Sequence, residues 1–332
     1  MRAIRLPSGN YRVRVYIGEL AGKKQFISVT EKTEREAMRR ALAIQARQPS
    51  QDSFDAALEA YIASKTPVLS PATILGYRNM QKRLRKDFRR FCAMPIYAIQ
   101  KADVQNIINS LLASGKTPKT ARNFNGLISA TLRSKDVILG QITLPKKYPA
   151  EIAVPTMDEV KAIIAETRGT ELEIPVLLAA FAGLRRGEAC ALEWSDIDFK
   201  KNIIHVSRDV VKGTDKKWHT KKPKTAASDR YVELPKKTIK RIEEIGELPS
   251  LNPHALTNRF ARVMKKMGLS YHFHSLRHFC VSYLHSLGIP DSYIMQRCGF
   301  ENDAILKAIY RHTLADQEKA FTNKANKAFS TF

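Results

Sequence analysis

The sequence predicts a multidomain protein that is mainly α-helical and carries small β elements. Its 332 residues are enough for two or three domains. Apolar residues make up 44% of the chain, which is enough to build hydrophobic cores. They recur at helical spacing over most of the chain, whereas the alternation of a strand is confined to a few short segments. We therefore expect several helical domains with short sheets.

Residues 1–48 predict a small β-rich module. Residues 11–16 alternate basic with apolar or aromatic side chains, which is the pattern of a half-buried strand. Residues 18–24 predict a turn, because they contain two glycines and two lysines. Residues 25–29 then predict the partner strand.

A helix is expected to follow over residues 33–44, and Thr33 and Glu36 open it with a capping box. The basic face of the strands suits a groove of DNA. A solvated hairpin that packs on the next domain is the alternative. The candidate DNA-binding residues of this module are Arg12, Arg14, Lys23 and Lys24.

Residues 51–135 predict an all-helical module. Its first helix carries an apolar stripe from Phe54 to Ile62, and Pro71 marks the start of another helix just after Ser70. The helices that follow are expected over residues 73–91, 104–112 and 117–134. The helix over 73–91 is strongly basic, which suggests contacts to the DNA backbone. The candidate residues on it are Lys82, Arg83, Arg85 and Lys86.

Residues 136–155 predict a linker, because glycine, proline and lysine are frequent there. Residues 156–332 form the third predicted domain, whose first helix opens with a capping box of Thr156 and Glu159. This domain is expected to be mostly helical with a β-hairpin or small sheet. Its strands are predicted at residues 202–207 and 230–234, on either side of a lysine-rich stretch.

The charge of the chain indicates its partner. Lysine and arginine number 56 against 32 acidic residues, which gives a net charge of +24. Such an excess predicts a polyanion, with nucleic acid ahead of acidic lipid. The alternative is a basic chain that stays in solution through self-repulsion.

Membrane and metal functions are not expected. The longest strongly apolar stretch, residues 174–184, is too short to span a bilayer, and the first residues lack the apolar core of a secretory signal. The four cysteines lie far apart, without a C-x-x-C pair, so we expect neither a zinc site nor a disulfide framework. This usage fits a reducing cytoplasm.

The candidate chemistry lies in two segments of the third domain. His274 and Arg277 are three residues apart, so on a helix they share one face and could bind the same phosphate. Arg185 lies after a helix that should end at Gly183, and Glu188 could hold it by a charge-assisted bond. Taken singly, a structural salt bridge and an ordinary histidine are the simpler interpretations.

As a set, these residues indicate phosphoryl transfer on DNA. Two arginines can clamp one phosphate and stabilise its transition state. Tyr310 could attack phosphorus and form a covalent intermediate, and a lysine on a flexible hairpin could protonate the leaving oxygen. The sequence has neither an acidic cluster with metal spacing nor a phosphate-binding P-loop. Exchange through phosphotyrosine is nearly isoenergetic, so we expect no metal, ATP or other cofactor.

Over essentially its whole length, the chain resembles the tyrosine recombinase (phage integrase) family. Residues 183–198 resemble the family's first arginine box, and residues 274–278 resemble its H-x-L-R-H box. The resemblance implies catalytic roles for Arg185, His274, Arg277 and Tyr310, with supporting roles for Glu188, His278 and Phe300.

The residues around Lys224 resemble the family's hairpin lysine motif, so Lys224 is the expected general acid, with Lys222 as the alternative. Lys221 and Lys222 are also candidate DNA contacts. One position departs from the family pattern. Phe300 stands where histidine or tryptophan is usual, and its ring cannot donate a hydrogen bond to the phosphate. We expect that Phe300 packs and that activity is retained.

The resemblance extends to the other modules. Residues 1–48 resemble an arm-type DNA-binding domain with a three-stranded sheet and a helix, and residues 51–135 resemble a helical, SAM-like core-binding domain. It implies a recombinase of a phage or integrative element, active as a homo-tetramer on paired core and arm sites of double-stranded DNA, with accessory DNA-bending proteins as further partners. The alternatives are a catalytically impaired integrase-like regulator and a monomeric enzyme similar to type IB topoisomerases.

Overall fold

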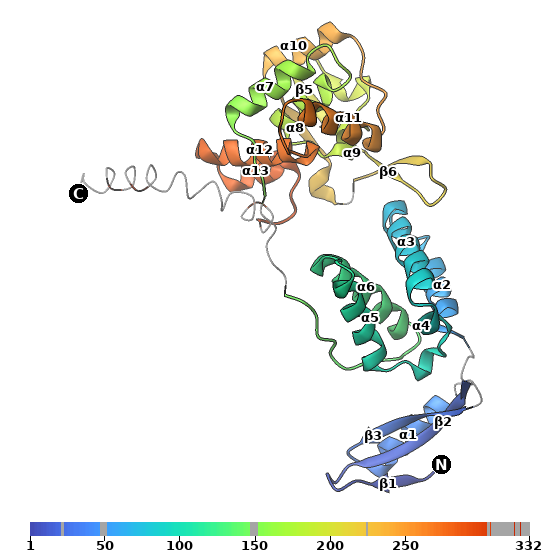
Figure 1. Ribbon diagram of the computed structural model, residues 1–332. Coiled ribbons are helices and arrows are strands. Elements are labelled where there is room, and N and C mark those ends of the chain that lie inside the picture. The colour runs from blue at the N-terminus through green and yellow to red at the C-terminus, as the bar shows by residue number, and fades with distance from the viewer. Residues whose placement is uncertain are drawn as a thin grey trace. The chain divides into compact units, whose positions relative to one another are not determined.

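The computed structural model describes residues 1–20, 23–46, 52–146, 152–223, 225–303, 306, 322 and 326. The chain divides into two compact units, Met1–Tyr148 and Pro149–Phe332. Helices predominate in both, and the sheets are small and antiparallel (Figure 1). The predicted fold class is thereby confirmed.

The first unit begins with a three-stranded antiparallel sheet covered by one helix. The strands β1 (Ala3–Arg5), β2 (Tyr11–Leu20) and β3 (Lys23–Glu31) lie in that order, and α1 (Glu34–Ala46) follows. Val13, Val15 and Val29 are buried together with two alanines of α1. Since side chains alternate along a strand, the exposed Arg12 and Arg14 lie on the opposite face of the sheet.

Two details of this module concern the predicted turn and cap. Residues 18–24 are mostly strand rather than turn, because β2 and β3 pair as far as Leu20 and Lys23. The register shifts between Tyr16 and Gly18, and such a bulge accommodates a glycine within a strand. The predicted cap of α1 is present, since the backbone N–H of Glu36 donates to Thr33 Oγ1 at 3.3 Å.

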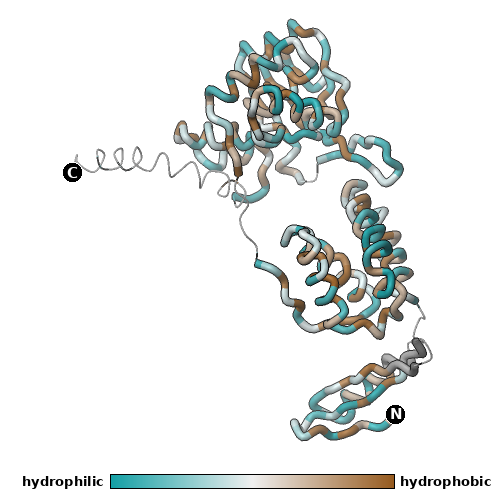
Figure 2. The backbone as a smooth tube through the Cα atoms, in the orientation of Figure 1, coloured by the Kyte–Doolittle hydropathy of each residue, from teal (hydrophilic) through white to brown (hydrophobic). Residues whose placement is uncertain are grey.

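A bundle of helices completes the first unit. It comprises α2 (Phe54–Lys65), α3 (Pro71–Asp87), α4 (Arg89–Ala93), the 3₁₀ turn η1 (Ile96–Ala98), α5 (Lys101–Ala113) and α6 (Pro118–Arg133). Their apolar faces turn inward to form one core. The apolar residues of these helices are the brown segments of the tube in Figure 2. Ser70 caps α3 and Thr117 caps α6, each followed by proline in the first turn.

The predicted basic helix over residues 73–91 is in fact two helices. Phe88 has φ −131° and ψ 43°, which is not helical, and it separates α3 from α4. The change of direction lets Phe91 pack on Phe54, with ring centroids 4.6 Å apart. Tertiary packing of one aromatic ring therefore overrides a continuous helical pattern.

The beginning of the predicted linker lies against the helical bundle. Thr143 exchanges two hydrogen bonds with the side chain of Gln105, at 2.9 and 3.1 Å. Arg122 donates twice to the carbonyl oxygen of Pro145, at 3.0 and 2.6 Å. These four bonds attach residues 143–145 to α5 and α6.

The second unit is mostly helical around a small sheet. Its helices are α7 (Met157–Thr167), α8 (Glu173–Ala182), α9 (Arg186–Ala189), α10 (Lys236–Ile245), α11 (Pro253–Lys266), α12 (Phe273–Ser286) and α13 (Asp291–Cys298), with 3₁₀ turns η2 (Trp194–Asp196) and η3 (Ala226–Ser228). The strands β4 (Ile197–Asp198), β5 (Ile203–Val206) and β8 (Arg230–Glu233) form one sheet, and β6 (Asp209–Lys212) and β7 (Trp218–Lys221) form a hairpin. Thr156 and Glu159 form the predicted capping box of α7.

Helix α8 runs through the centre of this unit and positions the start of the site. Nine of its ten residues are buried, and α12 packs along it (Figure 1). The helix ends at Gly183, whose φ of 62° is left-handed and therefore favours glycine. In the part of the chain that the structure describes, no helix is both long and apolar enough to cross a bilayer.

Replacing Gly183 by alanine is expected to destabilise the second unit. A Cβ there would lie 2.6 Å from Cys298 Sγ, and the left-handed backbone adds strain of roughly 1–2 kcal/mol. We expect a loss of about 2–4 kcal/mol in the free energy of unfolding, measured in urea.

The matched control is Gly246→Ala. Gly246 also has a left-handed φ, of 78°, but nothing lies within 4 Å of its Cβ position. It should therefore show the backbone strain alone. Equal losses in the two variants would mean that the contact with Cys298 does not constrain Gly183.

Candidate active site

The turn between α8 and α9 holds Arg185 against Glu188. Arg185 Nη1 donates to Glu188 Oε1 at 2.6 Å, and the backbone N–H of Arg185 donates to Glu188 Oε2 at 2.9 Å. The carboxylate thus caps α9 and fixes the arginine side chain at the same time. Sequence spacing predicted this pair, and the structure brings it together.

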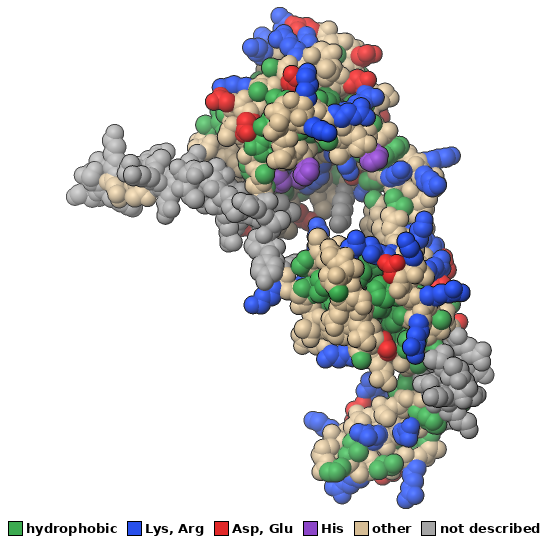
Figure 3. All heavy atoms as spheres, viewed as in Figure 1, with side chains coloured by type: hydrophobic (Ala, Val, Ile, Leu, Met, Phe, Trp, Pro, Cys, Tyr) green, Lys and Arg blue, Asp and Glu red, His purple; other side chains and the backbone are tan. Residues whose placement is uncertain are grey.

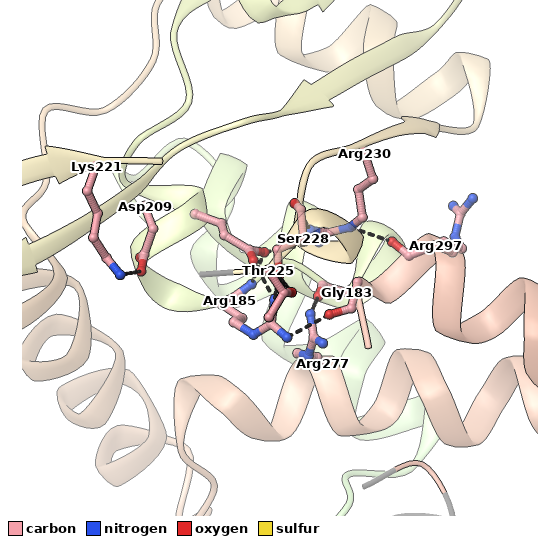
Figure 4. Close-up of polar contacts among 11 residues, drawn as sticks. Gly183, Arg185, Asp209, Lys221, Thr225, Ser228, Arg230, Arg277 and Arg297 are labelled. Carbon is pink, nitrogen blue, oxygen red and sulfur yellow. Dashed lines mark hydrogen bonds and ion pairs between the residues drawn. The ribbon is translucent and has the colours of Figure 1, made fainter. Parts of the chain in front are cut away.

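Glu188 has a second cationic partner that sequence reasoning missed. Arg230 Nη2 lies 3.0 Å from Glu188 Oε2, and only 3% of either side chain is exposed. The other nitrogens of Arg230 donate to the carbonyl oxygens of Ser228 and Arg297, at 3.0 and 2.8 Å (Figure 4). The signal in the sequence was the alternation of β8, which places Arg230 on the buried face beside Val232.

The protonation of Glu188 follows from these contacts. Burial alone would raise the pKa of its carboxyl, but Arg230 and Arg185 outweigh burial and lower the pKa. The carboxylate is therefore ionised at neutral pH, and its negative charge partly compensates the positive charges of Arg185 and Arg230.

Arg277 reaches the same place from α12, and none of the ion pairs found among the described residues includes it. It is 1% exposed, and its Nη1 donates to the carbonyl oxygen of Gly183, which ends α8 (Figure 4). Its Nη2 is buried and has no hydrogen-bond partner among the described residues. Burial and the charge of Arg185 lower the pKa of Arg277 to about 10, so the group is still a cation at neutral pH.

The segment after α13 contacts both arginines. The carbonyl oxygen of Gly299 accepts a hydrogen bond from Arg185 Nη2 at 2.8 Å. The ring of Phe300 lies under Arg277, with 4.3 Å between Cζ and the ring centroid. The two guanidinium groups therefore lie together, each held by this segment and by the turn that follows α8.

His274 and His278 lie one turn apart on α12, and their rings meet edge to face with centroids 4.6 Å apart. The protein around His274 partly desolvates its ring and, with the charges of nearby arginines, lowers its pKa to about 4. Burial and Arg277 likewise lower the pKa of His278 to about 4. Both histidines are thus neutral at pH 7, and each has one ring nitrogen that donates and one that accepts.

The lysines predicted on the hairpin are only partly placed. Lys221 ends β7, with its Nζ 3.9 Å from Asp209 Oδ2, and Lys222 follows it and is exposed. Lys224 lies outside the described residues. Tyr310 also lies outside them.

The candidate DNA contacts in the first unit fall into two groups. Lys82 and Lys86 are exposed on α3, whereas Arg83 pairs with Asp87 at 3.0 Å and Arg85 pairs with Asp55 at 2.7 Å. In the β-rich module, Arg12 and Arg14 are exposed, and Lys23 and Lys24 begin β3. Basic side chains are spread over the visible surface of both units (Figure 3).

The described residues contain no cluster of three or more histidine, cysteine or acidic side chains that could hold a metal ion. What they do bring together is two arginines and two neutral histidines. Such a set can bind an anion and stabilise added negative charge on it.

Replacing Glu188 by glutamine is expected to remove about 3–5 kcal/mol from the free energy of unfolding at pH 7, because it leaves the buried cation of Arg230 uncompensated. The lowered pKa of Glu188 means that its stabilisation is complete above the ordinary value of 4.5 and is lost as the pH falls through the folded-state value. The difference in the free energy of unfolding between wild type and variant, measured in urea, should therefore become smaller below about pH 4.5.

Glu244→Gln is the control, because the side chain of Glu244 is 50% exposed and lies 3.5 Å from Arg241. We expect it to change stability by less than about 0.5 kcal/mol. A gap for Glu188→Gln that stays constant down to pH 3 would contradict the assigned charge.

Comparison with known proteins identifies the family. Residues 154–317 match the phage integrase family. A tyrosine recombinase XerC-like protein of Caldanaerobacter subterraneus subsp. tengcongensis is 26% identical over 308 residues, which cover 78% of this chain and 78% of the relative.

Solved structures share the fold. A Tn1549 transposon integrase in complex with transposon right end DNA aligns with a TM-score of 0.69 at 17% identity, over 82% of this chain and 99% of that one. A lambda integrase from a tetramer bound to a Holliday junction aligns with a TM-score of 0.58 at 19% identity, over 92% and 94% of the two chains. Residues 154–317 therefore form a phage integrase family domain, and together with the matched recombinase relatives they identify the chain as a tyrosine-type site-specific recombinase.

Proposed function

We propose that this protein is the integrase of a phage or other mobile element, and that it cuts and rejoins double-stranded DNA through a 3′-phosphotyrosine. The observation that carries the proposal is the buried Nη2 of Arg277, which lies beside Arg185 and has no hydrogen-bond partner in the described part of the chain. A buried donor without a partner is unfavourable, and a phosphate oxygen would satisfy it. The two arginines then neutralise the charge that grows on phosphorus in the transition state.

In the proposed reaction, the phenolic oxygen of Tyr310 attacks the scissile phosphorus. The bond from phosphorus to the 5′-oxygen breaks, so the phosphate stays on the tyrosine and on the 3′ side of the DNA. Lys224, or alternatively Lys222, gives its proton to the departing 5′-oxygen. His274, neutral near pH 7, supplies one nitrogen that can donate to the phosphate and one that can accept the proton that the phenol of Tyr310 loses.

We assign DNA binding to all three predicted modules. The exposed Arg12 and Arg14 support an arm site on the open face of the sheet at residues 1–48. The exposed Lys82 and Lys86 support backbone contacts by residues 51–135, whereas the ion pair of Arg85 with Asp55 stabilises that module itself. We assign the chemistry to residues 156–332. Residues 136–155 link this domain to the module at residues 51–135.

The assembly proposed for the reaction is a homo-tetramer on two paired sites. The related lambda integrase has been solved as a tetramer bound to a Holliday junction and as a dimer bound to a core site. In this chain, the free 5′-hydroxyl of one duplex would attack the phosphotyrosine of the other, which reverses the first step and exchanges the strands. A chain that binds both an arm site and a core site is compatible with accessory proteins that bend the DNA.

Wild-type protein is expected to form a covalent adduct with a suicide DNA substrate, in which the 5′-hydroxyl diffuses away after cleavage. Tyr310→Phe removes only the nucleophilic oxygen, so it should bind the same DNA with equal affinity and form no adduct. Denaturing electrophoresis measures the adduct and gel shift the binding.

The same substrates separate the alternatives. A wild type that binds DNA but forms no adduct would identify a catalytically impaired regulator, and an adduct in both proteins would refute Tyr310 as the nucleophile. Relaxation of supercoiled DNA without strand transfer between two labelled duplexes would identify an enzyme similar to topoisomerases. Loss of cleavage in EDTA would contradict the mechanism without metal.

The general acid is expected to be Lys224. Lys224→Ala should slow cleavage about 10²–10⁴-fold. A substrate with sulfur in place of the 5′-bridging oxygen should restore the rate, because a thiolate leaves without being protonated. Single-turnover rates on the two substrates measure this effect.

Lys222→Ala is the matched control, since Lys222 is two residues away and exposed. It should show no selective rescue by sulfur. If only Lys222→Ala is rescued, Lys222 is the acid instead. Rescue of neither variant would exclude both lysines from protonating the leaving group.

A further inference from the structure

We infer that Phe300 is a positioning residue for Arg277. Its ring supports the guanidinium so that Nη2, which has no partner among the residues that the structure describes, is presented to the scissile phosphate. The inference rests on the proposed function, because it assumes that this phosphate binds at Arg277. It gives Phe300 a role that needs no hydrogen-bond donor at this position.

The contact itself is close and shielded. Arg277 Cζ lies 4.3 Å from the centre of the Phe300 ring, and the two residues are 1% and 6% exposed. The face of an aromatic ring carries partial negative charge, and its attraction for a cation grows as water is excluded. This contact therefore belongs to the stronger class of cation–π interactions.

Arg277 needs such support because its other surroundings disfavour its charge. It is buried, and both burial and Arg185 lower its pKa. Its neutral anchor is the carbonyl oxygen of Gly183, and none of the ion pairs found among the described residues includes it. The ring of Phe300 thus offsets part of the unfavourable free energy of holding two cations side by side.

The backbone around Phe300 fixes where the ring can lie. The N–H of Phe300 donates to the carbonyl oxygen of Met295 at 2.9 Å, which closes the end of α13. Gly299 has a left-handed φ of 67°, and a Cβ there would lie 2.8 Å from Arg230 Nη1. The ring packs among Cys280, Val281, Ile294 and Cys298.

Two neighbouring residues therefore hold the two arginines in different ways. Gly299 holds Arg185 through its carbonyl oxygen, and Phe300 holds Arg277 through its ring. A displacement of this segment would move both guanidinium groups together. Replacing the ring alone would affect Arg277, which makes the inference testable by a side-chain change.

Phe300→Leu and Phe300→Trp separate the aromatic face from hydrophobic bulk. On the suicide substrate under single-turnover conditions, the leucine variant should cleave roughly 10- to 30-fold more slowly than wild type. The tryptophan variant keeps an aromatic face and should cleave at least about fivefold faster than the leucine variant. DNA affinity should change little, because many other contacts to the backbone remain.

A neutral substrate tests whether the effect passes through the charge of Arg277. Each methylphosphonate diastereomer replaces one charged oxygen of the scissile phosphate by a methyl group. If the ring serves Arg277, the ratio of wild-type to Phe300→Leu rates should fall toward one on the diastereomer that lacks the oxygen facing Arg277. A purely structural defect would leave the ratio unchanged on both diastereomers.

Phe260→Leu is the matched control. Phe260 is 1% exposed and packs edge to face on Phe273, and none of the cation–π contacts found among the described residues includes it. The substitution therefore removes the same atoms from a core without removing a cation–π contact. This variant should have a lower melting temperature. At 20 °C it should cleave the phosphate and both methylphosphonates as fast as the wild type does.

If the wild type forms its adduct, any one of three results would overturn the inference. Phe300→Leu could cleave as fast as wild type, Phe300→Trp could be as slow as Phe300→Leu, or the rate ratio could persist on both methylphosphonates. A wild type that forms no adduct would overturn the proposed function itself, and this inference with it.

Discussion

One buried carboxylate, that of Glu188, holds the site together. It accepts from the side chain and backbone of Arg185 and from the guanidinium of Arg230, so it connects the turn after α8 with strand β8. Arg230 in turn reaches the end of α13 through the carbonyl oxygen of Arg297. Two segments far apart in the sequence thus meet on a single anion, and Arg230 attaches a third. Buried ion pairs need such complete hydrogen bonding, because the desolvation of their charges is otherwise uncompensated.

The charge balance of the site favours the binding of an anion. Glu188 provides one negative charge, while Arg185, Arg230 and Arg277 provide three positive ones, and both histidines on α12 are neutral at pH 7. The excess lies at Arg185 and Arg277, where an oxyanion with two free oxygens can bind. Fixed donors of this kind need little reorganisation when charge develops in the transition state.

Local patterns predicted much of this structure, and long-range contacts account for what they missed. The spacing of Arg185 and Glu188, the shared face of His274 and Arg277, and the capping boxes each involve a few residues, so the sequence alone could reveal them. The break at Phe88 depends on a ring 34 residues upstream, and the role of Arg230 depends on a partner 42 residues away. The ring of Phe300 under Arg277 is of the same kind. Residue type showed that Phe300 could not donate a hydrogen bond, but only the fold shows what it contacts.

The end of α8 makes the two arginines differ in their tolerance of acid. Arg277 is anchored on the carbonyl oxygen of Gly183, at the helix end where the partial charge of the aligned peptides is negative. An amide carbonyl does not take up a proton in the range where proteins stay folded, so this anchor has no titration point. Arg185 is anchored on a carboxylate, which does. Acidification therefore removes the charge of one anchor of Arg185, whereas the anchor of Arg277 is a backbone atom that neither acid nor a side-chain substitution can remove.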